Sequence, residues 1–137
     1  MAFLGEYEVS VTAGSRIVLP KKIRENLKGN TFILTKGYDI CLAGYDKQDW
    51  NNRAGELTKI SLLETDNVSK RRFLFSGACE IEIDVQGRFV IPKALFGYIN
   101  LIRSTLTIIG VGDHFEIWET KSWQGYLKQI NQQVTSN

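Results

Sequence analysis

A sixteen-residue stretch near the start of the chain returns in its second half, and this internal repeat limits what the chain can fold into. Residues 8–23 read EVSVTAGSRIVLPKKI and residues 80–95 read EIEIDVQGRFVIPKAL, at a constant offset of 72 residues. Five of the sixteen pairs are identical, and several others exchange one apolar residue for another at positions that a period of two requires. The sequence therefore predicts two similar half-domains that share one backbone path.

The only two prolines of the chain define the repeated unit. Pro20 follows Arg16 by four positions, and Pro92 follows Arg88 by four positions. Proline is favoured in the first turn of a helix, where its missing N–H costs nothing. The unit is thus predicted to be a strand, a turn that carries the arginine, a short strand and a helix opened by the proline.

Alternation of apolar residues and turn signals predict a further hairpin in each copy, with helices between and after the copies. In each hairpin an aromatic residue is followed five positions later by tryptophan, which suggests that the two rings pack where the next helix begins. The predicted strands are 6–11, 16–19, 31–35, 40–45, 104–109 and 114–118. The predicted helices run from Pro20 to Gly29 and over 47–60, 64–75 and 121–132, with a bend at 61–63 and a frayed tail at 133–137.

Length and composition favour one compact unit over residues 1–137. The chain is 43% hydrophobic, and halves of about 70 residues would each be marginally stable alone. No linker rich in proline, glycine or serine separates the halves, and no apolar run is long enough to span a membrane. The expected divisions are a first repeat (5–50), a helical insert (51–76), a second repeat (77–123) and a C-terminal helix with a frayed tail (124–137).

Residues suited to catalysis or metal binding are few. Cys41 and Cys79 have no CxxC spacing, so we expect reduced thiols in a cytoplasmic protein and no metal site. His114, the only histidine, alternates with apolar residues as a strand residue would. The pair Gly110 and Gly112 lacks the third glycine and the helix of a dinucleotide loop. No enzyme, cofactor or small-molecule substrate is therefore expected.

The turn before the repeated arginine carries more information. In the second copy Asp84 can accept backbone N–H groups across the turn, and Gly87 tolerates a positive φ, so Arg88 would project from a fixed base. One interpretation is that Arg16 and Arg88 only cap their own turns or pair with nearby carboxylates, among them Glu8, Glu80 and Asp84. The other is that two planar, permanently charged guanidinium groups on tight turns contact guanine or phosphate.

The distribution of charge supports the second interpretation in one copy only. The formal net charge of +2 is too small to indicate nucleic-acid binding by itself. The first copy adds Lys21 and Lys22 to Arg16, whereas the second copy carries more acidic than basic residues. The run 70–72 (KRR) could extend a phosphate-binding surface, or it could be a solvated helix face.

Four segments of the sequence resemble the MraZ family of bacterial proteins, which are built from two AbrB-like units. These segments are LGEYEVSV, LTKGYDICLAGY, RRFLFSGACEIEIDVQGRFVIP and GVGDHFEIWETKSW, and the resemblance extends from about residue 3 to Trp123. It implies an α+β fold in which two pseudo-symmetric swapped-hairpin units form a β-barrel core, with helices inserted between and after the repeats. It also implies a homo-oligomeric ring.

The resemblance further implies a sequence-specific regulator that binds double-stranded DNA. The expected target is a set of short G-rich direct repeats upstream of its own division and cell wall operon, which it would repress in association with the nucleoid. Arg16 and Arg88 correspond to the arginine that reads bases. Phosphate contact or support of the turns is expected from Thr12, Gly14, Ser15, Lys21, Lys22, Asp84, Gly87 and Lys93.

The first turn departs from the family pattern, because Thr12, Gly14 and Ser15 stand where Asp, Lys and Gly are usual. Two other functions therefore remain open: an interaction scaffold whose DNA binding has decayed, and an antitoxin-like DNA binder. Oligomerisation is expected in addition because the apolar hairpin segments 40–42 and 115–118 would be exposed in a single chain.

Overall fold

The computed structural model describes residues 2–59, 65–99 and 105–135. The predicted order of strands and helices is confirmed. The strands are β1 (Glu6–Ser10), β2 (Arg16–Val18), β3 (Thr31–Lys36), β4 (Leu42–Asp46), β5 (Cys79–Glu82), β6 (Arg88–Val90), β7 (Thr105–Gly110) and β8 (Phe115–Glu119). The helices are α1 (Lys21–Arg24), α2 (Lys47–Thr58), α3 (Thr65–Gly77), α4 (Lys93–Tyr98) and α5 (Thr120–Thr135).

Strands of the two copies pair with each other, as a swapped arrangement requires. Six strands form an antiparallel sheet in the order β1-β7-β8-β4-β3-β5. The first strand of each copy pairs with a hairpin strand of the other copy, β1 with β7 and β5 with β3. The two hairpins then meet where β4 pairs with β8. The two halves are consequently interlocked in a single sheet.

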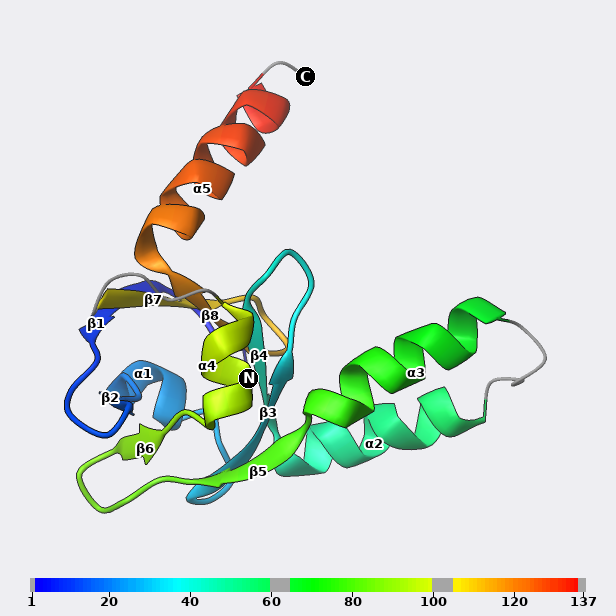
Figure 1. Cartoon of the computed structure of the whole chain (residues 1–137). Helices are drawn as coiled ribbons and strands as arrows, with labels where there is room; N and C mark the ends of the chain where they lie inside the picture. Colours follow the sequence, from blue (N-terminus) through cyan, green and yellow to red (C-terminus); the bar gives the residue numbers. More distant parts are fainter. Residues whose placement is uncertain (1, 60–64, 100–104, 136–137) are drawn as a thin grey trace.

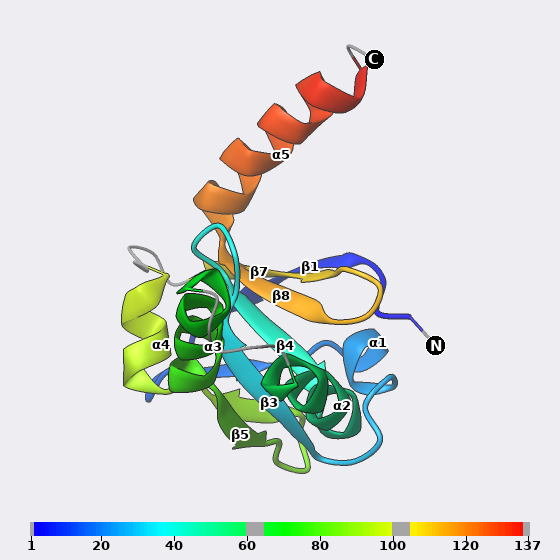
Figure 2. The same cartoon turned by 90° about the vertical axis from the view of Figure 1, so that its right-hand side faces the viewer.

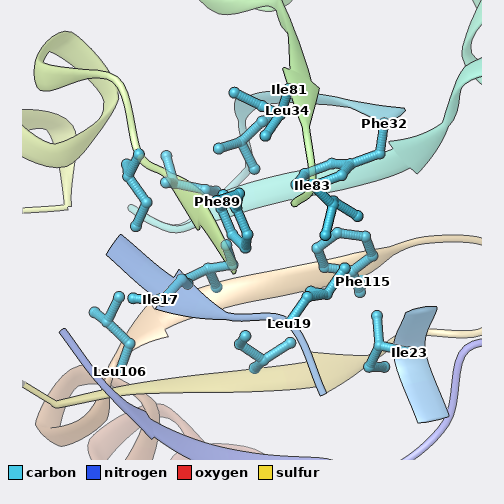
Figure 3. Close-up of a cluster of buried hydrophobic side chains, with 14 of the residues drawn as sticks. Ile17, Leu19, Ile23, Phe32, Leu34, Ile81, Ile83, Phe89, Leu106 and Phe115 are labelled. Carbon is cyan, nitrogen blue, oxygen red and sulfur yellow. The ribbon is translucent and has the colours of Figure 1, made fainter. Parts of the chain in front are cut away.

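The remaining strands, β2 and β6, form a separate two-stranded antiparallel ribbon, which packs on the hydrophobic core. Ile17 and Phe89 of the ribbon point inward among buried side chains that come from both copies (Figure 3). The rings of Phe32 and Phe89 meet edge to face at 5.1 Å, and the ring of Phe32 also contacts that of Phe115. One hydrophobic core therefore stabilises both halves, mainly through the removal of apolar surface from water.

The expected closed β-barrel is not formed by hydrogen-bonded strands in the part of the chain that the structure describes. Each edge strand of the six-stranded sheet, β1 and β5, has one neighbour in that sheet, and the β2–β6 ribbon is a sheet of its own. The fold is thus a mixed α+β structure with a large, open antiparallel sheet.

The helices lie outside this sheet. Figure 1 shows α2 and α3 side by side on one side of the molecule, away from the β2–β6 ribbon, and α5 extending outward to the C-terminus, as it also does in Figure 2. Thr35 of β3 donates its hydroxyl to the carbonyl of Leu74, which ties α3 to the sheet at 2.6 Å. Within the described ranges, no helix combines the length and apolar character that a membrane span needs.

Within each of the two aromatic pairs the rings contact each other, as predicted. The rings of Tyr45 and Trp50 lie 5.4 Å apart, and those of Trp118 and Trp123 lie at the same separation. Since α2 begins at Lys47 and α5 at Thr120, each pair joins the end of a hairpin to the first turn or two of the following helix.

Helix α1 is shorter than predicted because a side chain competes with the backbone. The amide of Asn26 donates to the carbonyl of Lys22, which the next helical turn would otherwise use. Pro20 is the N-cap residue of this helix, one position before its first helical residue. The chain therefore leaves the helix after Arg24 and does not continue to Gly29.

Other boundaries also differ from the prediction. Strand β4 begins at Leu42 and not at residue 40, because Asp39 and Ile40 have φ angles of 62° and 55°, which a strand cannot accommodate. Helix α5 continues to Thr135, so residues 133–135 are helical and not frayed. The predicted bend at 61–63 lies outside the described residues.

The two hairpins cover each other, so the expectation of exposed apolar hairpins is wrong. Leu42 lies opposite Ile117 across the β4–β8 pairing, and both are fully buried. Trp118 is also buried, whereas Ile40 remains half exposed at the tip of the first hairpin. Burial within one chain removes this argument for oligomerisation.

Candidate nucleic-acid interface

The β2–β6 ribbon places the two repeated arginines at diagonal corners of one small surface. Arg16 lies opposite Val90, and Arg88 lies opposite Val18, with the buried pair Ile17 and Phe89 between them. Two further hydrogen bonds extend the ribbon symmetrically: the Leu19 N–H donates to the Gly87 carbonyl at 2.8 Å, and the Ile91 N–H donates to the Ser15 carbonyl at 3.0 Å.

The outer face of the ribbon is composed of two cations and two exposed valines. Residues directly opposite each other in an antiparallel pair share a face, and alternate residues along a strand face opposite ways. Because Ile17 and Phe89 point into the core, Arg16, Val18, Arg88 and Val90 lie on the solvent side. Val18 and Val90 are each 45% exposed, so two apolar side chains lie on this face beside the arginines.

The turn of the second copy has the predicted geometry. One oxygen of Asp84, Oδ1, accepts the N–H groups of Gln86 at 2.9 Å and Arg88 at 2.8 Å. The Gly87 N–H donates to the Asp84 carbonyl at 2.9 Å, and Gly87 has a φ of +82°, a conformation that side chains with a Cβ rarely adopt. The backbone that carries Arg88 is therefore fixed by one residue, Asp84, through both its carboxylate and its main chain.

The same carboxylate also fixes the side chain of Arg88. The second oxygen of Asp84, Oδ2, accepts the Nε–H of Arg88 at 2.9 Å. The hydrogen bond from the Arg88 backbone N–H, together with this side-chain contact, holds the pKa of Asp84 below its ordinary value, so the carboxylate stays ionised at neutral pH. The two terminal nitrogens of Arg88 have no partner among the described residues and can bind an external acceptor.

The turn of the first copy is built differently. The hydroxyl of Thr12 donates to the Arg16 carbonyl at 3.1 Å, so the predicted hydroxyl contact is formed. Because Thr12 has no carboxylate, the N–H groups of this turn lack the acceptor that Asp84 supplies in the second copy. Gly14 and Ser15 both have positive φ angles, 80° and 60°, so a non-glycine residue occupies the position equivalent to Gly87. Within the described residues no carboxylate pairs with Arg16, which is exposed.

The lysines that follow the prolines lie at helix starts, as predicted. Lys21 and Lys22 open α1, Lys93 opens α4, and all three are exposed. None of them forms an ion pair with a described residue. These ammonium groups flank the ribbon in sequence, and they are available to anions in solution.

Of the two interpretations of the basic run at 70–72, the structure favours a helix face that is separate from this surface (Figure 1). The basic run at 70–72 belongs to α3, which Figure 1 places on the other side of the molecule from β2 and β6. Val18 and Val90, by contrast, were not predicted as surface residues. The sequence did contain a sign of their outward position, because the two valines are identical in the two copies and alternate with inward-facing residues.

The histidine lies outside the ribbon, in a set of satisfied contacts. His114 precedes β8 and is held between Asp113 at 2.6 Å and Glu116 at 3.1 Å, with its ring stacked on that of Tyr45. Burial alone would lower its pKa, but the hydrogen bonds to both carboxylates outweigh burial and raise it above its ordinary value. Asp113 also accepts a hydrogen bond from Arg53 of α2 at 2.6 Å, so this arrangement joins α2 to the hairpins.

Comparison with known proteins gives consistent matches over almost the whole chain. The family model described as "MraZ protein, putative antitoxin-like" matches residues 2–73 and again 74–137. The transcriptional regulator MraZ of Acetivibrio thermocellus is 40% identical over 134 residues, which cover 98% of this chain and 92% of that protein. The proteins of the same name from Clostridium tetani and Caldicellulosiruptor saccharolyticus are 44% and 46% identical, covering 90% and 88% of this chain and 86% and 83% of their own lengths.

Proposed function

The chain belongs to the MraZ family, and we propose that it is a DNA-binding transcriptional regulator that reads bases with the outer face of its β2–β6 ribbon. Its relatives carry the name of a transcriptional regulator and not of an enzyme. The observation that supports this proposal most is the shared exposed face of the ribbon, on which Arg16 and Arg88 lie at opposite corners.

The dimensions and chemistry of the ribbon suit the major groove of DNA. This groove admits a two-stranded β-ribbon, and an arginine with two free terminal nitrogens can donate to O6 and N7 of one guanine. Asp84 binds Arg88 through Nε and leaves those two nitrogens available. Between the arginines, the exposed methyl groups of Val18 and Val90 can contact the C5 methyl groups of thymine.

The surrounding lysines have a different role in this proposal. Lys21, Lys22 and Lys93 are exposed at the starts of α1 and α4, where an ammonium group can reach the phosphate backbone. Such contacts increase affinity and fix the register on the duplex, but they carry no sequence information. The turns formed by Thr12, Gly14, Ser15, Asp84 and Gly87 would then serve to aim the arginines.

The finer part of the proposal concerns the target. We propose that the protein binds short G-rich direct repeats upstream of its own division and cell wall operon and represses that operon, in the cytoplasm and in association with the nucleoid. Guanine is the base that arginine contacts best, and the ribbon carries two arginines. The family resemblance supports the operon and the direct repeats.

We further propose a closed ring of identical subunits. The formal net charge of +2 means that a single subunit neutralises few phosphates. Linked subunits on neighbouring repeats would bind at high effective concentration and would raise the affinity without new contacts.

A second candidate function has one observation in its favour. Asp84 and Arg88 form an ion pair within their own turn. Such a pair is expected if Arg88 only stabilises the turn, as it would in a scaffold that does not bind DNA. That alternative gives no role to the exposed Arg16, Val18 and Val90.

A gel-shift series separates the two functions. The purified protein is titrated against duplexes from the region upstream of its own gene that carry one repeat or three repeats in phase, and against an unrelated duplex of equal length. A regulator binds the three-repeat duplex far more tightly than the other two. Equal affinity for one and three repeats contradicts the ring mechanism, and absence of any preference for the upstream DNA favours the scaffold. Light scattering on the same sample tests the oligomer, which a clean monomer at micromolar concentration would contradict.

A further inference from the structure

Arg24 of α1 lies against the turn of the second copy, although it belongs to the first copy. A methyl group at Gly87 would come within 2.5 Å of both the guanidinium carbon and one terminal nitrogen of Arg24. The guanidinium group therefore occupies the space that a side chain at Gly87 would need. It lies next to the segment that runs from Asp84 to Arg88.

This guanidinium group lacks the partner that a partly buried cation normally has. Its Nε is buried and forms no hydrogen bond. No carboxylate among the described residues pairs with Arg24, and Asp84 directs its oxygens to Arg88 and Gln86. Buried charges are usually paired, because an unpaired one loses its hydration without compensation. An anion from outside the chain would supply the missing partner.

The two turns differ in this respect. The repeat offset of 72 residues makes Phe96 the counterpart of Arg24 and Ser15 the counterpart of Gly87. Phe96 is a partly buried apolar residue packed against the core. The cation is thus present beside the second turn and absent from the equivalent position of the first.

On the basis of the proposed function, we propose that Arg24 is a DNA-binding residue that contacts a backbone phosphate oxygen beside the base read by Arg88. A phosphodiester is the anion that a ribbon in the major groove brings nearest to its own turns. Because Phe96 offers no such contact, the two ends of the pseudo-symmetric ribbon are unequal. The ribbon therefore binds each repeat in one orientation, as a direct repeat requires.

The first experiment measures the salt dependence of binding for Arg24→Gln, Arg24→Lys and a control. The control, Lys28→Gln, removes one positive charge from an ammonium group that donates to Gln48. The probes are the upstream duplex and an unrelated duplex, since a phosphate contact acts on both. Arg24→Gln is expected to weaken binding to both and to lower the slope of log K against log salt by about 0.9 per bound subunit. Arg24→Lys should retain most of the parent's slope. Lys28→Gln should lower the slope less than Arg24→Gln does.

A second experiment tests the contact directly. Neutral methylphosphonate linkages are placed one at a time through one repeat of the upstream duplex. At one linkage the parent protein is expected to lose about two- to tenfold in affinity, as an exposed charged hydrogen bond would. Arg24→Gln should lose nothing further at that linkage.

The outcomes are distinct. An Arg24→Gln variant with an unchanged salt slope and losses at the same linkages as the parent overturns the phosphate contact. A variant that loses only its preference for the upstream duplex shows that Arg24 supports the turn, and this also overturns the contact. If the parent binds neither duplex, the proposed function itself fails. Circular dichroism and light scattering confirm that each variant keeps the fold and oligomeric state.

Discussion

The carboxylate of Asp84 holds both the backbone and the side chain of Arg88. One carboxylate oxygen lies 2.8 Å from the Arg88 amide nitrogen, and the other lies 2.9 Å from the Arg88 Nε. The first copy has no such pair, because Thr12 occupies the equivalent position and contacts only the Arg16 carbonyl. The two arginines are thus presented by turns of different stiffness. On the proposed function, this difference is expected to affect DNA binding.

Replacement of Asp84 by Asn is expected to reduce base discrimination more than fold stability. The amide oxygen can still accept the turn N–H groups, but the amide nitrogen would face the Nε–H of Arg88, donor against donor. Arg88 would lose its fixed direction, and the preference for the upstream duplex over unrelated DNA should fall. Competition gel shifts measure this preference. Glu82→Gln, which removes a charge from the neighbouring strand, should leave this preference unchanged. An equal loss of preference in both variants would contradict the role of Asp84 in directing Arg88.

Gly87→Ala and Gly14→Ala should have similar effects on stability but different effects on DNA binding. Both glycines have φ near +80°, so a Cβ costs about 1–2 kcal/mol at either position. Only at Gly87 does the added methyl group displace Arg24, since nothing lies within 4 Å at Gly14. Urea denaturation checks the stabilities, and titration with an unrelated duplex checks the binding. Equal binding losses would show that the Arg24 contact is irrelevant.

The pH dependence of stability should carry a contribution from His114. Its pKa is raised in the folded protein, so its contribution is complete below the unfolded pKa of about 6.5 and is lost as the pH rises through the folded pKa. The free energy of unfolding should therefore decrease over this window from the acidic to the neutral side. In His114→Gln the decrease should be absent or much smaller. Denaturation series at several pH values compare the two proteins, and identical pH profiles would refute the assignment.

Most of the fold could be predicted because the repeat places equivalent residues on equivalent elements. The repeat predicted the short strands that contain Ile17 and Phe89, and the turn at Asp84 and Gly87 followed from ordinary turn chemistry. Boundaries were less predictable. The early end of α1 depends on the side chain of Asn26, a choice that helical spacing does not reveal.

Features that arise between the copies could not be predicted from the residues alone. The burial of the two hairpins depends on the β4–β8 pairing, which joins residues about 75 positions apart, as Leu42 and Ile117 do. The contact between Arg24 and Gly87 likewise crosses from one copy to the other. Sequence patterns report local periodicity, and they do not report which residue of one repeat packs on a turn of the other.

The role of the ribbon is tested most directly by the operator preference of Arg16→Ala and Arg88→Ala, compared with Lys21→Ala. A bidentate contact with guanine is worth about 1–3 kcal/mol of discrimination, so each arginine variant should lose affinity for the upstream duplex while binding unrelated DNA nearly as the parent does. Arg88→Ala should lose at least as much preference for the upstream duplex as Arg16→Ala does, because the turn that carries Arg88 is the stiffer one. Lys21→Ala should weaken both complexes and flatten the salt dependence. If both arginine variants, folded and assembled as the parent is, still preferred the upstream duplex to the same degree, the ribbon would not be the base-reading surface.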